Sequence, residues 1–92
     1  MVRYYVIFEI YGEKSGLQNL DEFCKERGIS LEYCERFDND SFKDYRESVR
    51  KELGFADPFK AWLSFKNISK YEQILAEMNE REDIDIWIKI DM

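Results

Sequence analysis

The chain has 92 residues, a formal net charge of −6 and a hydrophobic fraction of 45%. This length predicts one domain, residues 1–92, with a single modest core. No apolar run approaches the roughly 20 residues that a membrane-spanning helix needs, and the first residues lack the basic start and the small-residue cleavage site of a signal peptide. We therefore expect a cytoplasmic protein that makes no membrane contact.

The absence of histidine excludes much of the chemistry that small enzymes use. It removes Ser-His and Cys-His nucleophile pairs and histidine bases, and it leaves Cys24 and Cys34 without the further ligands of a zinc site. The stretch 38–40 (Asp-Asn-Asp) resembles the start of a calcium loop, but Lys43 and Val49 stand where that loop needs glycine and glutamate. We therefore predict a protein that is not an enzyme and has no cofactor or metal site, with both cysteines as small buried side chains.

Hydrophobic periodicity predicts seven elements in the order strand, helix, strand, helix, strand, helix, strand. They cover residues 2–11, 17–28, 29–37, 41–53, 59–66, 67–82 and 84–90. Gly28 supplies a helix stop, and Asp38 or Asp40 is expected to cap the helix 41–53. Glu9, within the first strand, is expected to be solvated or paired with lysine rather than to bind magnesium in a nuclease site.

This order predicts an α+β fold, the ferredoxin-like sandwich. Such a fold has a four-stranded antiparallel sheet with two crossover helices on one face. The helix 41–53 is an extra one, because that fold usually has only a short link between its second and third strands. A doubly wound, three-layer sheet is the competing architecture.

Strand parity places a group of large side chains on the sheet face away from the crossover helices. The group consists of Tyr5, Ile7, Tyr11, Trp62 and Trp87. Three interpretations of this face remain open. In the first, the helix 41–53 covers the group and forms a third layer. In the second, a protein binds there, which is either a second copy of the chain or a different target. In the third, nucleic acid binds there.

Residues 61–65 (AWLSF) resemble the end of the RNP1 strand of RNA-recognition motifs, with Trp62 at a base-stacking position. The basic and glycine positions that precede this end are filled here by Pro58, Phe59 and Lys60. Acids outnumber bases along the whole length of the chain, and this balance opposes phosphate binding. Nucleic acid is therefore not the partner that we expect.

The sharpest excess of acids lies near the end of the chain. It consists of Glu77, Glu80, Glu82, Asp83 and Asp85. An acidic surface is steered toward a basic one, and basic clefts are where enzymes handle nucleic acids. We therefore expect a protein that inhibits or regulates a basic protein partner, comparable in size and charge with immunity proteins, antitoxins and phage anti-defence factors. The alternative is a homodimeric ferredoxin-like domain that binds a small ligand on its sheet face.

Overall fold

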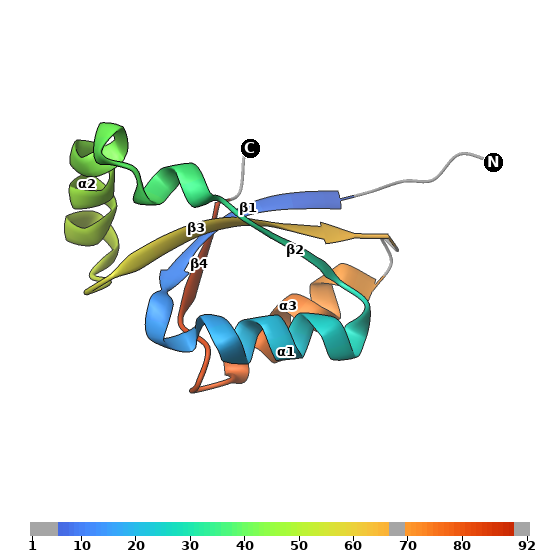
Figure 1. Cartoon of the computed structure of the whole chain (residues 1–92). Coiled ribbons are helices and arrows are strands. Elements are labelled where there is room, and N and C mark those ends of the chain that lie inside the picture. Colours follow the sequence, from blue (N-terminus) through green and yellow to red (C-terminus); the bar gives the residue numbers. More distant parts are fainter. Residues whose placement is uncertain (1–5, 67–69, 90–92) are drawn as a thin grey trace.

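The computed structural model describes residues 6–66 and 70–89, and Figure 1 shows how they are arranged. In these residues the chain forms the strands β1 (Val6–Glu13), β2 (Ser30–Tyr33), β3 (Pro58–Phe65) and β4 (Ile86–Lys89). The α-helices between them are α1 (Leu17–Arg27), α2 (Lys43–Leu53) and α3 (Tyr71–Glu80). Short 3-10 turns are η1 (Lys14–Gly16), η2 (Glu35–Asp38) and η3 (Asp40–Phe42). The predicted α+β class is confirmed.

The four strands form one antiparallel sheet in the order β2-β3-β1-β4. β1 and β3 are central, while β2 and β4 form the two edges. The helices α1 and α3 lie together on one face, below the sheet in Figure 1, and an ion pair joins Arg27 to Glu77 between them. The competing doubly wound sheet is wrong for the described residues, because its strands would be parallel, whereas the four strands here pair antiparallel.

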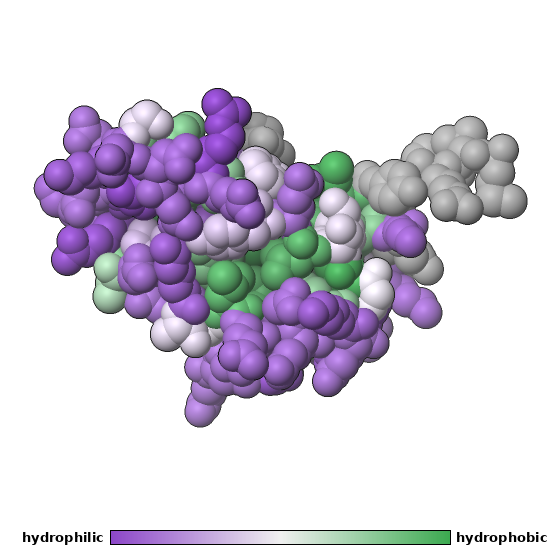
Figure 2. Space-filling model, in the orientation of Figure 1, coloured by the Kyte–Doolittle hydropathy of each residue, from purple (hydrophilic) through white to green (hydrophobic). Residues whose placement is uncertain are grey.

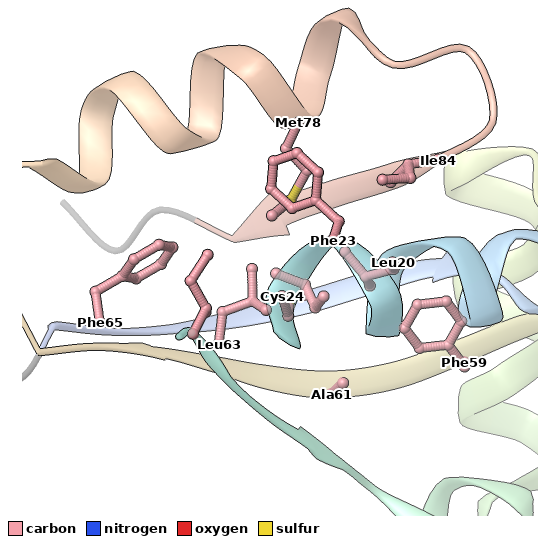
Figure 3. Close-up of a cluster of buried hydrophobic side chains, with 11 residues drawn as sticks. Leu20, Phe23, Cys24, Phe59, Ala61, Leu63, Phe65, Met78 and Ile84 are labelled. Carbon is pink, nitrogen blue, oxygen red and sulfur yellow. The ribbon is translucent and has the colours of Figure 1, made fainter. Parts of the chain in front are cut away.

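The main core lies between the sheet and the helices α1 and α3 (Figure 3). Its buried members are Ile10, Leu20, Phe23, Cys24, Ile29, Phe59, Ala61, Leu63, Phe65, Met78 and Ile84. Every second residue of β3 belongs to this set, as the alternation of its sequence predicted. Each fully buried leucine or phenylalanine contributes about 1.5–3 kcal/mol of transfer free energy. Because these side chains point toward the helices, the others on each strand point to the opposite face.

Two glycines lie where a side chain would be unfavourable, one because of its backbone conformation and one because other atoms approach it closely. Gly28 ends α1 with a φ of 68°, in the left-handed region, as predicted. Gly12 lies in β1, where a Cβ atom would be 2.6 Å from the ring of Phe59 and 2.9 Å from the carbonyl oxygen of Asp85. Glycine at this point therefore lets the core ring and the start of β4 approach the central strand.

The helix α2 lies on the other side of the sheet from α1 and α3, at one end of the molecule (Figure 1). A second and smaller cluster joins it to the sheet. The buried members of this cluster are Tyr11, Phe37, Val49 and Phe55. The third layer that we considered for helix 41–53 is therefore present, but α2 sits over one end of the sheet.

The segment between β2 and α2 differs from its prediction. β2 ends at Tyr33, whereas the sequence pattern predicted a strand as far as residue 37. The turn η2 redirects the chain so that Phe37 becomes fully buried in the second cluster. The expected capping of α2 by Asp38 or Asp40 is also wrong, because the N-cap position is Phe42 and Asp38 instead accepts a hydrogen bond from the Tyr33 hydroxyl at 2.7 Å.

Candidate protein-binding surface

The outer face of the sheet is the side that points away from α1 and α3. On β1, β3 and β4 it carries Ile7, Glu9, Tyr11, Lys60, Trp62, Trp87 and Lys89. Glu9 lies opposite Trp62 on one neighbouring strand and opposite Lys89 on the other. Tyr5, which the parity also assigned to this face, lies outside the described residues.

Two large apolar side chains on the outer face are exposed to solvent. Ile7 is 61% exposed and Trp87 is 43% exposed, and Trp62 is half-buried. Exposed apolar surface of this kind often marks a binding site, and tryptophan is enriched among the residues that dominate interface energies. Ile7, Trp62 and Trp87 therefore form the candidate contact surface.

The centre of the outer face is charged. The Glu9 oxygens lie 2.6 Å from Nζ of Lys60 and 3.3 Å from Nζ of Lys89. Burial alone would raise the pKa of Glu9, but the hydrogen bonds and positive charges of the two lysines outweigh burial and lower it below the ordinary value. The predicted lysine pairing of Glu9 is confirmed, and its carboxylate is occupied by structural contacts.

Lys60 connects this charge to the aromatic side chains. Its Nζ atom lies 5.8, 5.4 and 5.7 Å from the ring centres of Tyr11, Tyr45 and Trp62. Burial by itself would lower the pKa of Lys60. The hydrogen bond to Glu9 and the nearby charges together outweigh burial, so the pKa is raised. Lys60 therefore stays charged at neutral pH and attracts the rings around it. We did not single it out from the sequence, although it shares the parity of Trp62.

Tyr11 points to the outer face but is covered there by the segment that contains α2. It is 5% exposed, and its ring centre lies 5.9 Å from that of Phe37 and 6.0 Å from that of Trp87. Its hydroxyl is hydrogen-bonded to the hydroxyl of Tyr45, and burial together with this bond raises the pKa of Tyr11 well above the ordinary value. Tyr11 is therefore a core residue of the second cluster, while Tyr45, 42% exposed, continues the aromatic surface onto α2.

Two of the predicted acidic residues are held in ion pairs. Glu77 accepts a hydrogen bond from Nε of Arg27 at 3.2 Å, which links α3 to α1. Asp83 accepts two bonds from Arg81, at 2.8 and 2.6 Å, and this contact lowers the pKa of Asp83. These two carboxylates thus have local partners.

The other three predicted acids, Glu80, Glu82 and Asp85, are exposed. They lie at the end of α3 and in the loop to β4, at the base of the helix layer in Figure 1. Asp85 immediately precedes β4 and is two residues from Trp87, so the acidic loop meets the outer face at this point. The acids and the aromatic residues are therefore adjacent at one position and do not share a single face.

Grooves run along both edges of the sheet, and the one beside β4 has the more apolar lining. The groove beside β2 has a volume of about 460 Å³ and is lined by Lys14, Leu17, Gln18, Asp21, Leu31 and Tyr33. Figure 2 shows hydrophobic side chains in the middle of the view, above the polar surface of α1. The groove beside β4 has a volume of about 390 Å³ and is lined by Leu75, Ala76, Asn79, Ile86, Trp87 and Ile88.

The cysteines are both free thiols. Cys24 is buried in the main core as predicted, whereas Cys34 is only partly buried, against the second cluster. Burial, together with the charge of Asp21, raises the pKa of Cys24 to about 11, so this thiol is protonated at neutral pH. Within residues 6–66 and 70–89, none of the helices has the length and hydrophobicity that a transmembrane segment requires.

Comparison of the chain with models of protein families, with curated proteins and with solved structures finds no match. The arrangement of the residues themselves is therefore the basis of the functional proposal.

Proposed function

We propose that this chain is a small acidic binding protein that docks on a protein partner through the outer face of its sheet and inhibits or regulates that partner. The observation that carries the proposal is the exposure of Ile7 (61%) and Trp87 (43%) on the same sheet face as the half-buried Trp62, with α2 at one end of that face. Tryptophan is enriched among the residues that dominate interface energies, and polar groups of the partner would have to meet the charges of Glu9, Lys60 and Lys89.

The net charge of −6 favours a basic partner, and we propose an enzyme that handles nucleic acids. The exposed acids Glu80, Glu82 and Asp85 would attract its positive surface, and Asp85 would bring that surface to Trp87. The protein would then act in the manner of immunity proteins, antitoxins or phage anti-defence factors. A cytoplasmic location is part of the proposal and agrees with the two free thiols.

We assign the fold to the ferredoxin-like sandwich on the strand order β2-β3-β1-β4 and on the two helices that share one face. In this assignment α2 is an insertion between the second and third strands. The insertion rests on Tyr11 at one end of the outer face and leaves Ile7 exposed.

The second candidate, a homodimer that holds a small ligand between its sheet faces, has less support. Packing two outer faces together would bury Glu9, Lys60 and Lys89 from both copies. Taking such charges out of water costs several kcal/mol per ion before any pairing is counted. A protein partner with its own polar groups can meet these charges more easily.

The test is affinity capture from the native host with chemical cross-linking, using the wild-type chain and the Ile7→Ser variant. Ile7 is exposed on β1, so its replacement leaves the core and β4 intact. We expect the wild type to capture a basic protein that rising salt releases, and we expect Ile7→Ser to reduce that capture at least tenfold. Purified partner would then be assayed for loss of its activity on nucleic acid.

Glu26→Ala is the matched control, because Glu26 is exposed on α1, on the helix side of the sheet. It should capture the partner as well as the wild type does. If Ile7→Ser and Trp62→Ala both retain the same proteins as the wild type, the outer face is not the interface.

A further inference from the structure

We propose that β4 pairs with β4 of a second copy of this chain, so that two four-stranded sheets join into one continuous antiparallel sheet. This pairing uses the edge of the sheet. It shares Trp87 and Asp85 with the proposed docking surface, whereas Ile7 and Trp62 of that surface lie on other strands. Among the described residues no strand occupies the outer side of β4. An unprotected edge of this kind is a template for another strand.

The register of β4 on β1 determines which backbone groups are available at this edge. The N–H of Glu13 donates to the carbonyl oxygen of Asp85 at 3.0 Å, and the pairing continues from Gly12 opposite Ile86. Because hydrogen-bonded and non-bonded pairs alternate in an antiparallel ladder, Trp87 also bonds to β1. The N–H and C=O groups of Ile86 and Ile88 then point outward, away from β1.

These outward groups match a second copy of the same strand. A two-fold axis at Trp87 places Ile86 of one copy opposite Ile88 of the other, and each such pair exchanges two backbone hydrogen bonds. The two Trp87 side chains meet on the outer face. Asp85 of one copy then lies opposite Lys89 of the other, twice, so each strand end carries a pair of opposite charges.

The other edge of the sheet lacks this self-complementarity. The N–H of Cys34 donates to the carbonyl oxygen of Lys60, so the groups of Leu31 and Tyr33 point outward from β2. The equivalent pairing of two β2 strands would set Glu32 directly opposite Glu32 of the second copy. Like charges in that position are destabilising. In this register, self-pairing is therefore favoured at β4 and opposed at β2.

The groove of about 390 Å³ between α3 and β4 also supports pairing with a second copy of the chain. Extending the sheet beyond β4 would bring α3 of the second copy alongside α3 of the first. The two helices would run antiparallel, and Leu75 and Ala76 of each would face the groove of the other. Apolar surface that is open to solvent in one chain would be buried in the pair.

The test reverses the charges of Asp85 and Lys89 one at a time and measures dimer formation by analytical ultracentrifugation. We expect the wild type to form a dimer, and we expect Asp85→Lys and Lys89→Glu to weaken it at least roughly tenfold each, because every variant homodimer has two like-charge pairs. An equimolar mixture of the two variants restores both opposite-charge pairs, so it should form a heterodimer with affinity near that of the wild type. Circular dichroism of each variant checks that it is folded.

Amide hydrogen exchange gives a second readout that requires no substitution. The amides of Ile86 and Ile88 should become protected as the protein concentration rises, whereas the Trp87 amide, bonded to β1, should be protected at all concentrations. A wild type that stays monomeric at millimolar concentration would overturn the pairing. So would a dimer that neither single variant weakens, or a variant mixture that fails to associate.

Discussion

Glu9 is the residue whose charge balances the outer face. It lies between Lys60 and Lys89, which lower its pKa below the ordinary value of 4.5. A carboxylate with a lowered pKa in the folded state stabilises the fold above pH 4.5, and this contribution is lost as the pH falls through the lowered pKa. We expect Glu9→Gln to reduce the free energy of unfolding at neutral pH by about 1 kcal/mol. Urea unfolding should show this difference shrinking in acid, where the wild-type carboxylate also becomes protonated.

Glu47→Gln is the control for this substitution. Glu47 pairs with Arg50 at 3.2 Å on α2, and both side chains are about half exposed. Exposed pairs of this spacing contribute only about 0.2–0.5 kcal/mol. Equal losses for Glu9→Gln and Glu47→Gln would mean that the two-lysine contact gives no special stability.

Trp62 and Tyr11 show that the sequence predicts which way a strand side chain points but not whether it is accessible to solvent. Both were assigned to the outer face from alternation alone, and both have that orientation, because a strand must send successive side chains to opposite sides. Their accessibility was not predictable in the same way. Tyr11 is covered by Phe37, which the sequence pattern placed in a strand.

The attachment of α2 depends on one turn. In η2 the side chain of Phe37 is fully buried, and its carbonyl oxygen accepts a 2.6 Å hydrogen bond from Nη1 of Arg46 on α2. The second cluster is small, so the loss of this ring should remove its centre. We expect Phe37→Ala to cost about 3–5 kcal/mol of the local stability of α2. Amide exchange in α2 should then accelerate by roughly 100-fold or more.

The amides of α1 are the internal reference for this experiment. They belong to the main core, which does not include Phe37, so their exchange should change much less. Phe42→Ala is the matched variant, because Phe42 is half-buried in η3 and its ring centre lies 6.4 Å from that of Tyr45. If Phe37→Ala speeds exchange equally in α1 and α2, the two clusters unfold as one unit and α2 is not a separate layer.

The regular elements were predictable from local pattern, and the connection from β2 to α2 was not. The four strands and three helices have periods that are visible in windows of a few residues, and Gly28 marks a stop. The end of β2 is decided by distant packing, since Phe37 is buried against residues that lie 12 and 18 positions further along the chain, Val49 and Phe55. A window of local sequence contains no information on that contact.

At the scale of the whole molecule, the aromatic and acidic residues belong to different regions. The outer face combines Glu9 with Lys60 and Lys89, whereas the exposed acids lie at the end of α3 and in the following loop. The sequence showed both groups but not their separation, because strand parity defines faces and does not define where a loop lies. In the proposed function, attraction of the partner and contact with it therefore fall to different residues, and Asp85 is adjacent to both groups.

The net charge of −6 gives the two proposed associations different dependences on salt. Two copies of the chain repel each other at long range, and the screening length falls from about 30 Å at 0.01 M ionic strength to about 8 Å at 0.15 M. Added salt should therefore leave the β4 dimer unchanged or tighten it, since backbone hydrogen bonds and apolar contacts hold it together. The same change should weaken capture of a basic partner, whose attraction is screened. Sedimentation equilibrium and capture in matched buffers measure both. A dimer that dissociates with salt as steeply as the partner complex would have to be held mainly by the Asp85 and Lys89 charges, and strand pairing would then contribute little.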